Sequence, residues 1–142
     1  MVQTFTEAKT RVQGRDAIHF AHGTSLTFAY DINEHGLSER AILSLGRGST
    51  RPGHFFTFLV GPPPHPGPGL QLAYEFSLRR PPPRAVLVGG LPQDVFEALE
   101  SIGLIETLAL SGAPIGETVL SPGVFLTIDS YNLSRWQILQ FP

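Results

Sequence analysis

One alternating stretch, residues 69–90, constrains the fold of this chain more than any other feature. From Leu70 to Leu78 the larger apolar side chains occupy every second position, and a period of two is typical of a β-strand with one apolar and one polar face. An Arg-Pro-Pro-Pro-Arg turn at residues 80–84 separates this segment from a second apolar run, residues 85–88. The pattern predicts a β-hairpin.

Similar patterns occur at residues 25–43 and 124–139. In the first, Leu26, Phe28, Tyr30 and Ile32 alternate with more polar residues or alanine before an Arg-led apolar run, and the second is a looser version. Two interpretations stay open, because amphipathic hairpins also resemble one another by chance. The chain contains either three copies of one hairpin or three unrelated hairpins.

Three further segments complete the expected architecture. Residues 54–61 are apolar on both faces, which is typical of a central strand or of a strand at an interface. Residues 92–103 have the features of a helix, with proline at the first position, acidic residues in the first turns and Gly103 at the end. Residues 1–13 are expected to form an N-terminal arm or an edge strand.

These elements predict one β-rich domain over residues 1–142, an all-β fold with one short helix. We expect an antiparallel β-sandwich of the jelly-roll type or a closed β-barrel, and the alternative is a trefoil-like arrangement of three hairpins. A chain of 142 residues is long enough to bury a core without cross-links or metals.

Composition excludes several classes of function. Cysteine is absent, which rules out disulfides, thiolate metal sites and cysteine nucleophiles. The net charge is -2 and the basic residues are scattered, so we expect no nucleic-acid binding. No apolar run is long enough to span a bilayer or to act as a signal peptide, so we expect a soluble protein that does not bind membranes.

No set of residues has the spacing of a known catalytic or metal site. A metal site built from His22, His35 and His54 is the best arrangement available, but no HxH pair with a following Glu accompanies it. Gly-rich segments lack the Lys-Ser/Thr of a phosphate loop, and Ser111 lacks the glycine of a nucleophile elbow. We therefore predict no catalytic residue, no cofactor and no metal, and do not expect an enzyme.

The aromatic residues suggest a second class of function. Tyr30, Tyr74, Tyr131 and Trp136 would suit a platform for sugar rings, but Tyr30 and Tyr74 share the alternating face with leucines and are better explained as core residues.

The function predicted first is that of a structural protein of a large assembly, a virion component such as a capsid, decoration or tail protein. Only 15% of residues are charged, 13 prolines stiffen the loops, and one strand is apolar on both faces. Such a protein is expected to form homo-oligomers through protein–protein contacts, with its interface at Phe55, Phe58, Pro63, Pro64 and Pro82. The alternative is a carbohydrate- or peptide-binding module, and the third candidate is a histidine-metal enzyme.

Overall fold

In a computed structural model, the described residues are 17–35, 54–61, 69–108 and 123–141. They form six strands and four helices, in the order β1 (Ile18–Ser25), α2 (Leu26–His35), β2 (His54–Gly61), α4 (Gly69–Ser77), β3 (Arg84–Leu91), α5 (Gln93–Ser101), β4 (Ile105–Leu108), β5 (Gly123–Thr127), α6 (Ile128–Leu133) and β6 (Arg135–Phe141).

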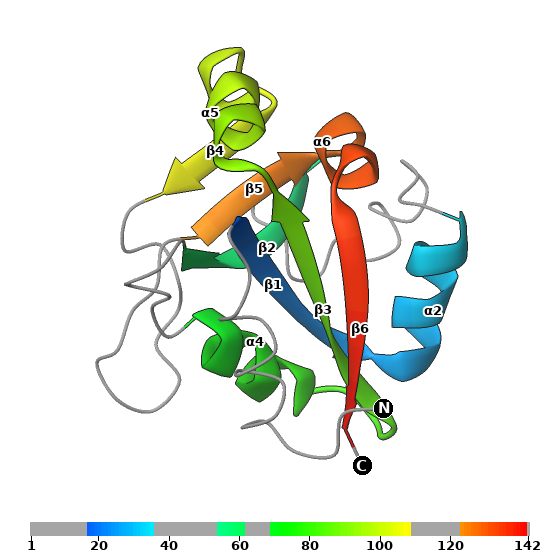
Figure 1. Cartoon of the computed structure of the whole chain (residues 1–142). Coiled ribbons are helices and arrows are strands. Elements are labelled where there is room, and N and C mark those ends of the chain that lie inside the picture. Colours follow the sequence, from blue (N-terminus) through cyan, green and yellow to red (C-terminus); the bar gives the residue numbers. More distant parts are fainter. Residues whose placement is uncertain (1–16, 36–53, 62–68, 109–122, 142) are drawn as a thin grey trace.

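The strands form one open sheet in the order β4-β5-β2-β1-β3-β6 (Figure 1), and each neighbouring pair is antiparallel. The antiparallel arrangement of the strands is confirmed, whereas the prediction of an all-β fold with one short helix is wrong, because the described residues also form four helices. The closed barrel is wrong, because β4 and β6 are the two edges of the sheet and do not pair with each other. A jelly roll would need a second sheet, whereas the described residues form a single sheet.

Helices cover both faces of this sheet, and two apolar clusters result. Helices α2, α5 and α6 pack on one face, whose central buried residues include Phe20, Phe55 and Leu87. Helix α4 packs on the other face against residues such as Phe58 and Val86. Strand β3 is therefore apolar at successive positions, as expected for a strand that is buried on both sides.

The segment predicted as the first strand of the organising hairpin is the helix α4. Its buried residues are Gly69, Leu70, Leu72, Ala73 and Ser77, a spacing of three and four that places them on one side of a helix. Leu78, which the alternating pattern places in the core, follows the helix and is 49% exposed. The hairpin prediction is wrong for this half, whereas residues 85–88 do lie in a strand, β3.

The other two predicted hairpins also contain helices. Residues 26–35 form α2, in which Leu26, Ala29 and Ile32 are buried three positions apart, and Tyr30 is 51% exposed. In the third segment β5 and β6 are strands, but α6 lies between them and they pair with different neighbours. The predicted trefoil of three hairpins is therefore wrong.

The remaining predicted elements lie as follows. Helix α5 falls within residues 92–103, and β2 is the segment predicted to be apolar on both faces. Residues 1–13 lie outside the described part of the chain.

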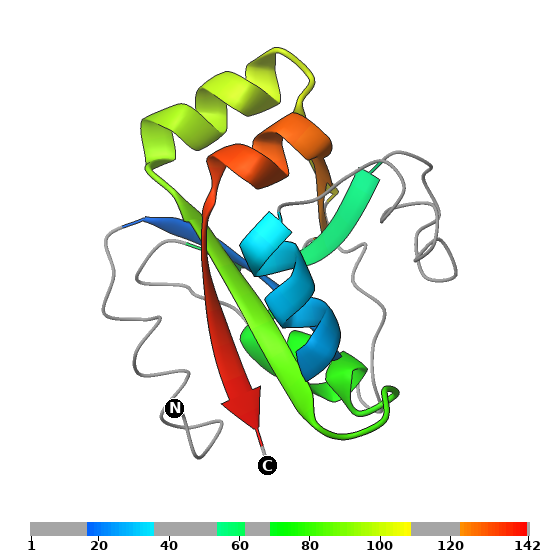
Figure 2. The same cartoon turned by 90° about the vertical axis from the view of Figure 1, so that its right-hand side faces the viewer.

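The molecule has two distinct ends along β3. Helices α5 and α6 lie together at one end in both views, and the turn between α4 and β3 lies at the other (Figures 1 and 2). Strand β3 joins these ends directly, because it begins at that turn and leads into α5.

Candidate functional site

Three arginines gather on the turn that joins α4 to β3. This segment, residues 78–84, is called the arginine turn below and has the sequence Leu-Arg-Arg-Pro-Pro-Pro-Arg. All of it is exposed except Arg84, which is partly buried. Three positive charges and a half-exposed leucine therefore lie within one short segment.

The protein holds this turn and two of its guanidinium groups in place. The Nε–H of Arg84 donates to the Arg80 carbonyl at 2.9 Å, and the Arg79 guanidinium lies 4.2 Å from the centre of the Phe76 ring. In the turn that follows α4, the Arg80 amide donates to the Ser77 carbonyl at 3.0 Å. Ordering the arginines on binding would therefore cost less entropy than for mobile side chains.

The charges of the arginine turn are not neutralised within the described part of the protein. Arg79 and Arg84 make the contacts just given, and none of the three arginines forms an ion pair with a described carboxylate. Pro83, immediately before β3, fixes the turn to the first residue of α2, since its carbonyl accepts from the Leu26 amide at 3.0 Å. The turn therefore presents three positive charges on a backbone that hydrogen bonds hold in place.

The opposite end of the molecule is acidic. Four exposed carboxylates lie there, and we call them the acidic end: Asp94, Glu97, Glu100 and Asp129. The first three are spaced three apart on the outer side of α5, and the fourth is on α6. One basic residue of the described chain, Arg135, lies nearby at the start of β6.

Hydrogen bonds to one carbonyl tie the two helices of the acidic end together. The Leu104 carbonyl, just after α5, accepts from the Thr127 amide at 3.2 Å, from Thr127 Oγ1 at 3.1 Å and from Ser130 Oγ at 2.8 Å. Thr127 Oγ1 also accepts from the Ser130 amide and so caps α6. Consequently α5 and α6 present their carboxylates on one connected surface.

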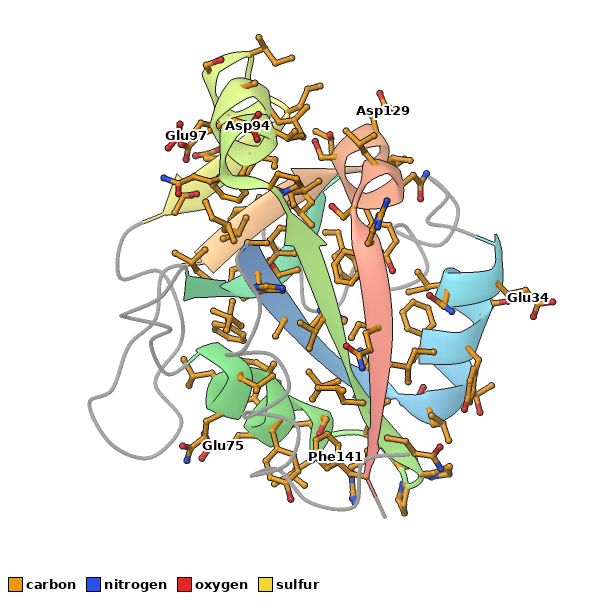
Figure 3. The ribbon with its side chains drawn as sticks, viewed as in Figure 1. Glu34, Glu75, Asp94, Glu97, Asp129 and Phe141 are labelled. Carbon is orange, nitrogen blue, oxygen red and sulfur yellow. The ribbon has the colours of Figure 1, made fainter. Side chains whose placement is uncertain are left out.

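The arginine turn and the acidic end are too far apart to neutralise each other. In Figure 3, Asp94, Glu97 and Asp129 lie at one end, whereas Phe141, which pairs with Arg84 across β3 and β6, lies at the other. The eight residues of β3 span roughly 25 Å. The Debye length at physiological salt is about 8 Å, so the two ends act as separate charged surfaces.

The sequence contains a signal for this charge separation that the prediction missed. Residues 85–134 include six acidic residues and no lysine or arginine, so the basic residues are not evenly scattered. Arg79, Arg80 and Arg84 immediately precede that stretch. The overall charge of -2 conceals this division of the chain.

A buried aromatic cluster lies between these ends, on the face covered by α2, α5 and α6. The Tyr131 ring stacks on Trp136 at 4.3 Å between centroids and meets the Phe55 ring at 4.8 Å. Trp136 Nε1 donates to the Tyr131 carbonyl at 2.8 Å. Among the described residues the Tyr131 hydroxyl has no hydrogen-bond partner, and burial raises the pKa of Tyr131.

His22 belongs to the same cluster and is held as a neutral base. Its ring lies 4.2 Å from that of Phe55, and Nδ1 lies 2.9 Å from the Phe56 carbonyl, so the neutral ring donates from Nδ1. The pKa of His22 is lowered from 6.5 to about 4, chiefly by burial; the hydrogen bond to Phe56 raises it in part, and the charge of Arg80 adds to the lowering. These contacts fit a packing role for His22.

The residues predicted from sequence to form an interface are not brought together. Phe55 and Phe58 are buried on opposite faces of the sheet, within the protein's own core. Pro82 is exposed and lies in the arginine turn, whereas Pro63 and Pro64 lie outside the described residues.

The candidate metal ligands and the aromatic platform are also dispersed. Among the described residues, no three His, Asp or Glu side chains are close enough to hold a metal ion. The side chains of His35 and His54 are not among those that the structure describes. Tyr30 is exposed on α2, Tyr74 packs against Phe141 on the opposite face, and Tyr131 is buried against Trp136.

Comparisons with protein-family models, curated proteins and solved structures found no match to this chain. Within the described ranges, no helix is long and apolar enough to cross a membrane.

Proposed function

We propose that this protein acts through protein–protein contacts, as a component that associates into a larger assembly. The observation that carries the proposal is the arginine turn. It combines three positive charges without described acidic partners, a leucine that is 49% exposed and a backbone held by its own hydrogen bonds. Arginines beside an exposed apolar side chain are typical of protein interfaces.

An acidic protein surface fits the arginine turn better than a nucleic acid does. The whole chain carries a net charge of -2, and the described acidic end would repel a phosphate backbone that extended along the molecule. The turn offers three arginines, which is fewer than the phosphate contacts that a nucleic-acid-binding protein usually makes. Carboxylates of a protein partner would pair with them over a smaller area.

The other predicted functions have less support from the described geometry. A carbohydrate platform needs several rings exposed side by side, whereas Tyr131 is buried against Trp136 on one face of the sheet, Tyr74 packs on the other face, and Tyr30 is exposed on α2. A histidine-metal enzyme needs a ligand cluster, and none is found among the described residues. A virion subunit stays a hypothesis within the assembly class, which electron microscopy of the associated material would test.

The test of association is the mass of the protein in solution. Light scattering of the full-length protein from about 10 μM to about 1 mM should show a rising average mass, because contacts of this size have dissociation constants in the micromolar to millimolar range. A constant monomer mass up to the highest concentration would contradict the proposal.

A further inference from the structure

We infer that the partner of the arginine turn is the acidic end of a second copy of this chain, so that copies associate head to tail. This inference rests on the proposed function and adds to it the identity of the partner and the direction of assembly. Each end carries what the other end requires: three guanidinium groups at one, and four exposed carboxylates on α5 and α6 at the other.

Apolar side chains accompany the charges at both ends. Leu78 is 49% exposed at the arginine turn, Ile102 is 68% exposed just after α5, and Leu133 is 58% exposed at the end of α6. Burying such side chains supplies the favourable free energy that weak, solvent-exposed ion pairs do not supply alone.

Symmetric contacts through either end are disfavoured by the same charges. A twofold axis at the arginine turn would bring six arginines together, and one at the acidic end would bring eight carboxylates together against two Arg135 side chains. Like charges brought together at an interface repel one another, so both symmetric arrangements are disfavoured. Contact between unlike ends is heterologous, and it produces a row of copies that all point the same way.

The contact is expected to be weak and sensitive to salt. The arginine turn contains seven residues, fewer than the roughly 20–30 residues that each partner contributes to a standard interface. We therefore expect a dissociation constant above about 1 μM for a single contact. Association should weaken at least tenfold between about 0.01 M and about 1 M salt, where the Debye length falls from roughly 30 to 3 Å.

Two charge-reversed variants test the inference. The turn variant carries Arg79→Glu and Arg80→Glu, and the acidic-end variant carries Glu97→Lys and Glu100→Lys. All four positions are exposed, and none belongs to the apolar core, so both variants should fold. Circular dichroism and the fluorescence of the single tryptophan check this before association is measured.

Each variant alone should remain monomeric at concentrations where the unmodified protein associates. An equimolar mixture should associate again, because the intact acidic end of the turn variant meets the intact arginine turn of the acidic-end variant, and the two reversed ends also carry opposite charges. Sedimentation velocity of the mixture and of each variant alone shows whether association returns on mixing. The control is Asp31→Lys with Glu34→Lys on α2, which changes the net charge as much as the acidic-end variant does and should associate like the unmodified protein.

The outcomes separate the inference from the proposed function. If the unmodified protein associates and both variants associate equally well, copies use another surface, and the inference fails while the proposed function stands. A mixture of the two variants that stays monomeric also overturns the inference. If the unmodified protein is monomeric throughout, the proposed function fails and the inference with it. Binding of a single-stranded RNA probe that the turn variant loses would instead assign the arginines to phosphate.

Discussion

At the scale of single residues, His22 makes the stability of the fold dependent on pH. Its pKa is about 4 in the folded protein and 6.5 in an unfolded chain, chiefly because the ring is buried against Phe55. Between these values the unfolded state binds a proton that the folded state does not. Stability is therefore complete above about pH 6.5, falls as the pH is lowered, and levels off below about pH 4 for this group.

The size of the effect can be measured by urea denaturation at pH 7 and pH 4. The shift corresponds to at most about 3 kcal/mol, and solvent screening reduces this figure because His22 is only half-buried. The variant His22→Gln keeps an amide that can donate to the Phe56 carbonyl but does not titrate. Between pH 7 and pH 4 this variant should lose less unfolding free energy than the unmodified protein. Equal losses in both proteins would show that His22 does not cause the pH dependence.

At the scale of elements, the contact between α4 and β1 requires a residue without a side chain at position 23. A Cβ atom added to Gly23 would lie 1.8 Å from the Ala73 carbonyl oxygen and 2.7 Å from the Ser77 nitrogen, both in the backbone of α4. No rotamer change relieves such an overlap, so the helix would have to move away from the sheet.

The variant Gly23→Ala should therefore lose about 3 kcal/mol or more of unfolding free energy in urea, or fail to fold. The matched control is Gly103→Ala after α5, where an added Cβ meets no atom within 4 Å but the backbone φ is +82°. Its cost should be limited to the roughly 1–2 kcal/mol of a left-handed alanine. Similar losses in the two variants would contradict the close packing of α4 on β1.

The strands were more predictable from sequence than the short helices, and α4 shows why. Residues 54–61 and 85–88 are nearly continuous apolar runs, and only a strand buried on both faces needs that pattern in so short a segment. Helix α4 has nine residues, fewer than three turns, so its leucines and aromatics fit a period of two as well as one of 3.6. The small buried residues Ala73 and Ser77 distinguish the two periods, because the alternating pattern places both on the polar face of a strand.

At the scale of the whole molecule, the sequence contained the charges of the candidate site but not their arrangement. The absence of basic residues from 85–134 can be read directly from the chain. The three arginines and the carboxylates of α5 lie at opposite ends because β3 runs between them as a strand. Asp129 lies beside α5 because hydrogen bonds to the Leu104 carbonyl hold α6 there. Such long-range pairings are not encoded in a local pattern.

The two apolar clusters should unfold together, because β1, β2 and β3 contribute residues to both. The single tryptophan, Trp136, packs against Phe20 on the face covered by α2, α5 and α6, so its fluorescence reports on that face. Phe58 is buried on the opposite face, where its ring lies 5.1 Å from that of Phe76 on α4. Any effect of Phe58 on the fluorescence transition must therefore pass through the sheet.

The variant Phe58→Ala should lower the unfolding free energy by about 3–5 kcal/mol, since it leaves a cavity beneath α4. The fall should be the same by Trp136 fluorescence and by circular dichroism if the described elements unfold as one unit. Phe20→Ala, which removes the same side chain from the tryptophan's own face, provides the comparison. A fluorescence midpoint that moves for Phe20→Ala but not for Phe58→Ala would mean that α4 and its cluster detach separately. In that case the arginine turn, which follows α4, could be displaced without unfolding the acidic end.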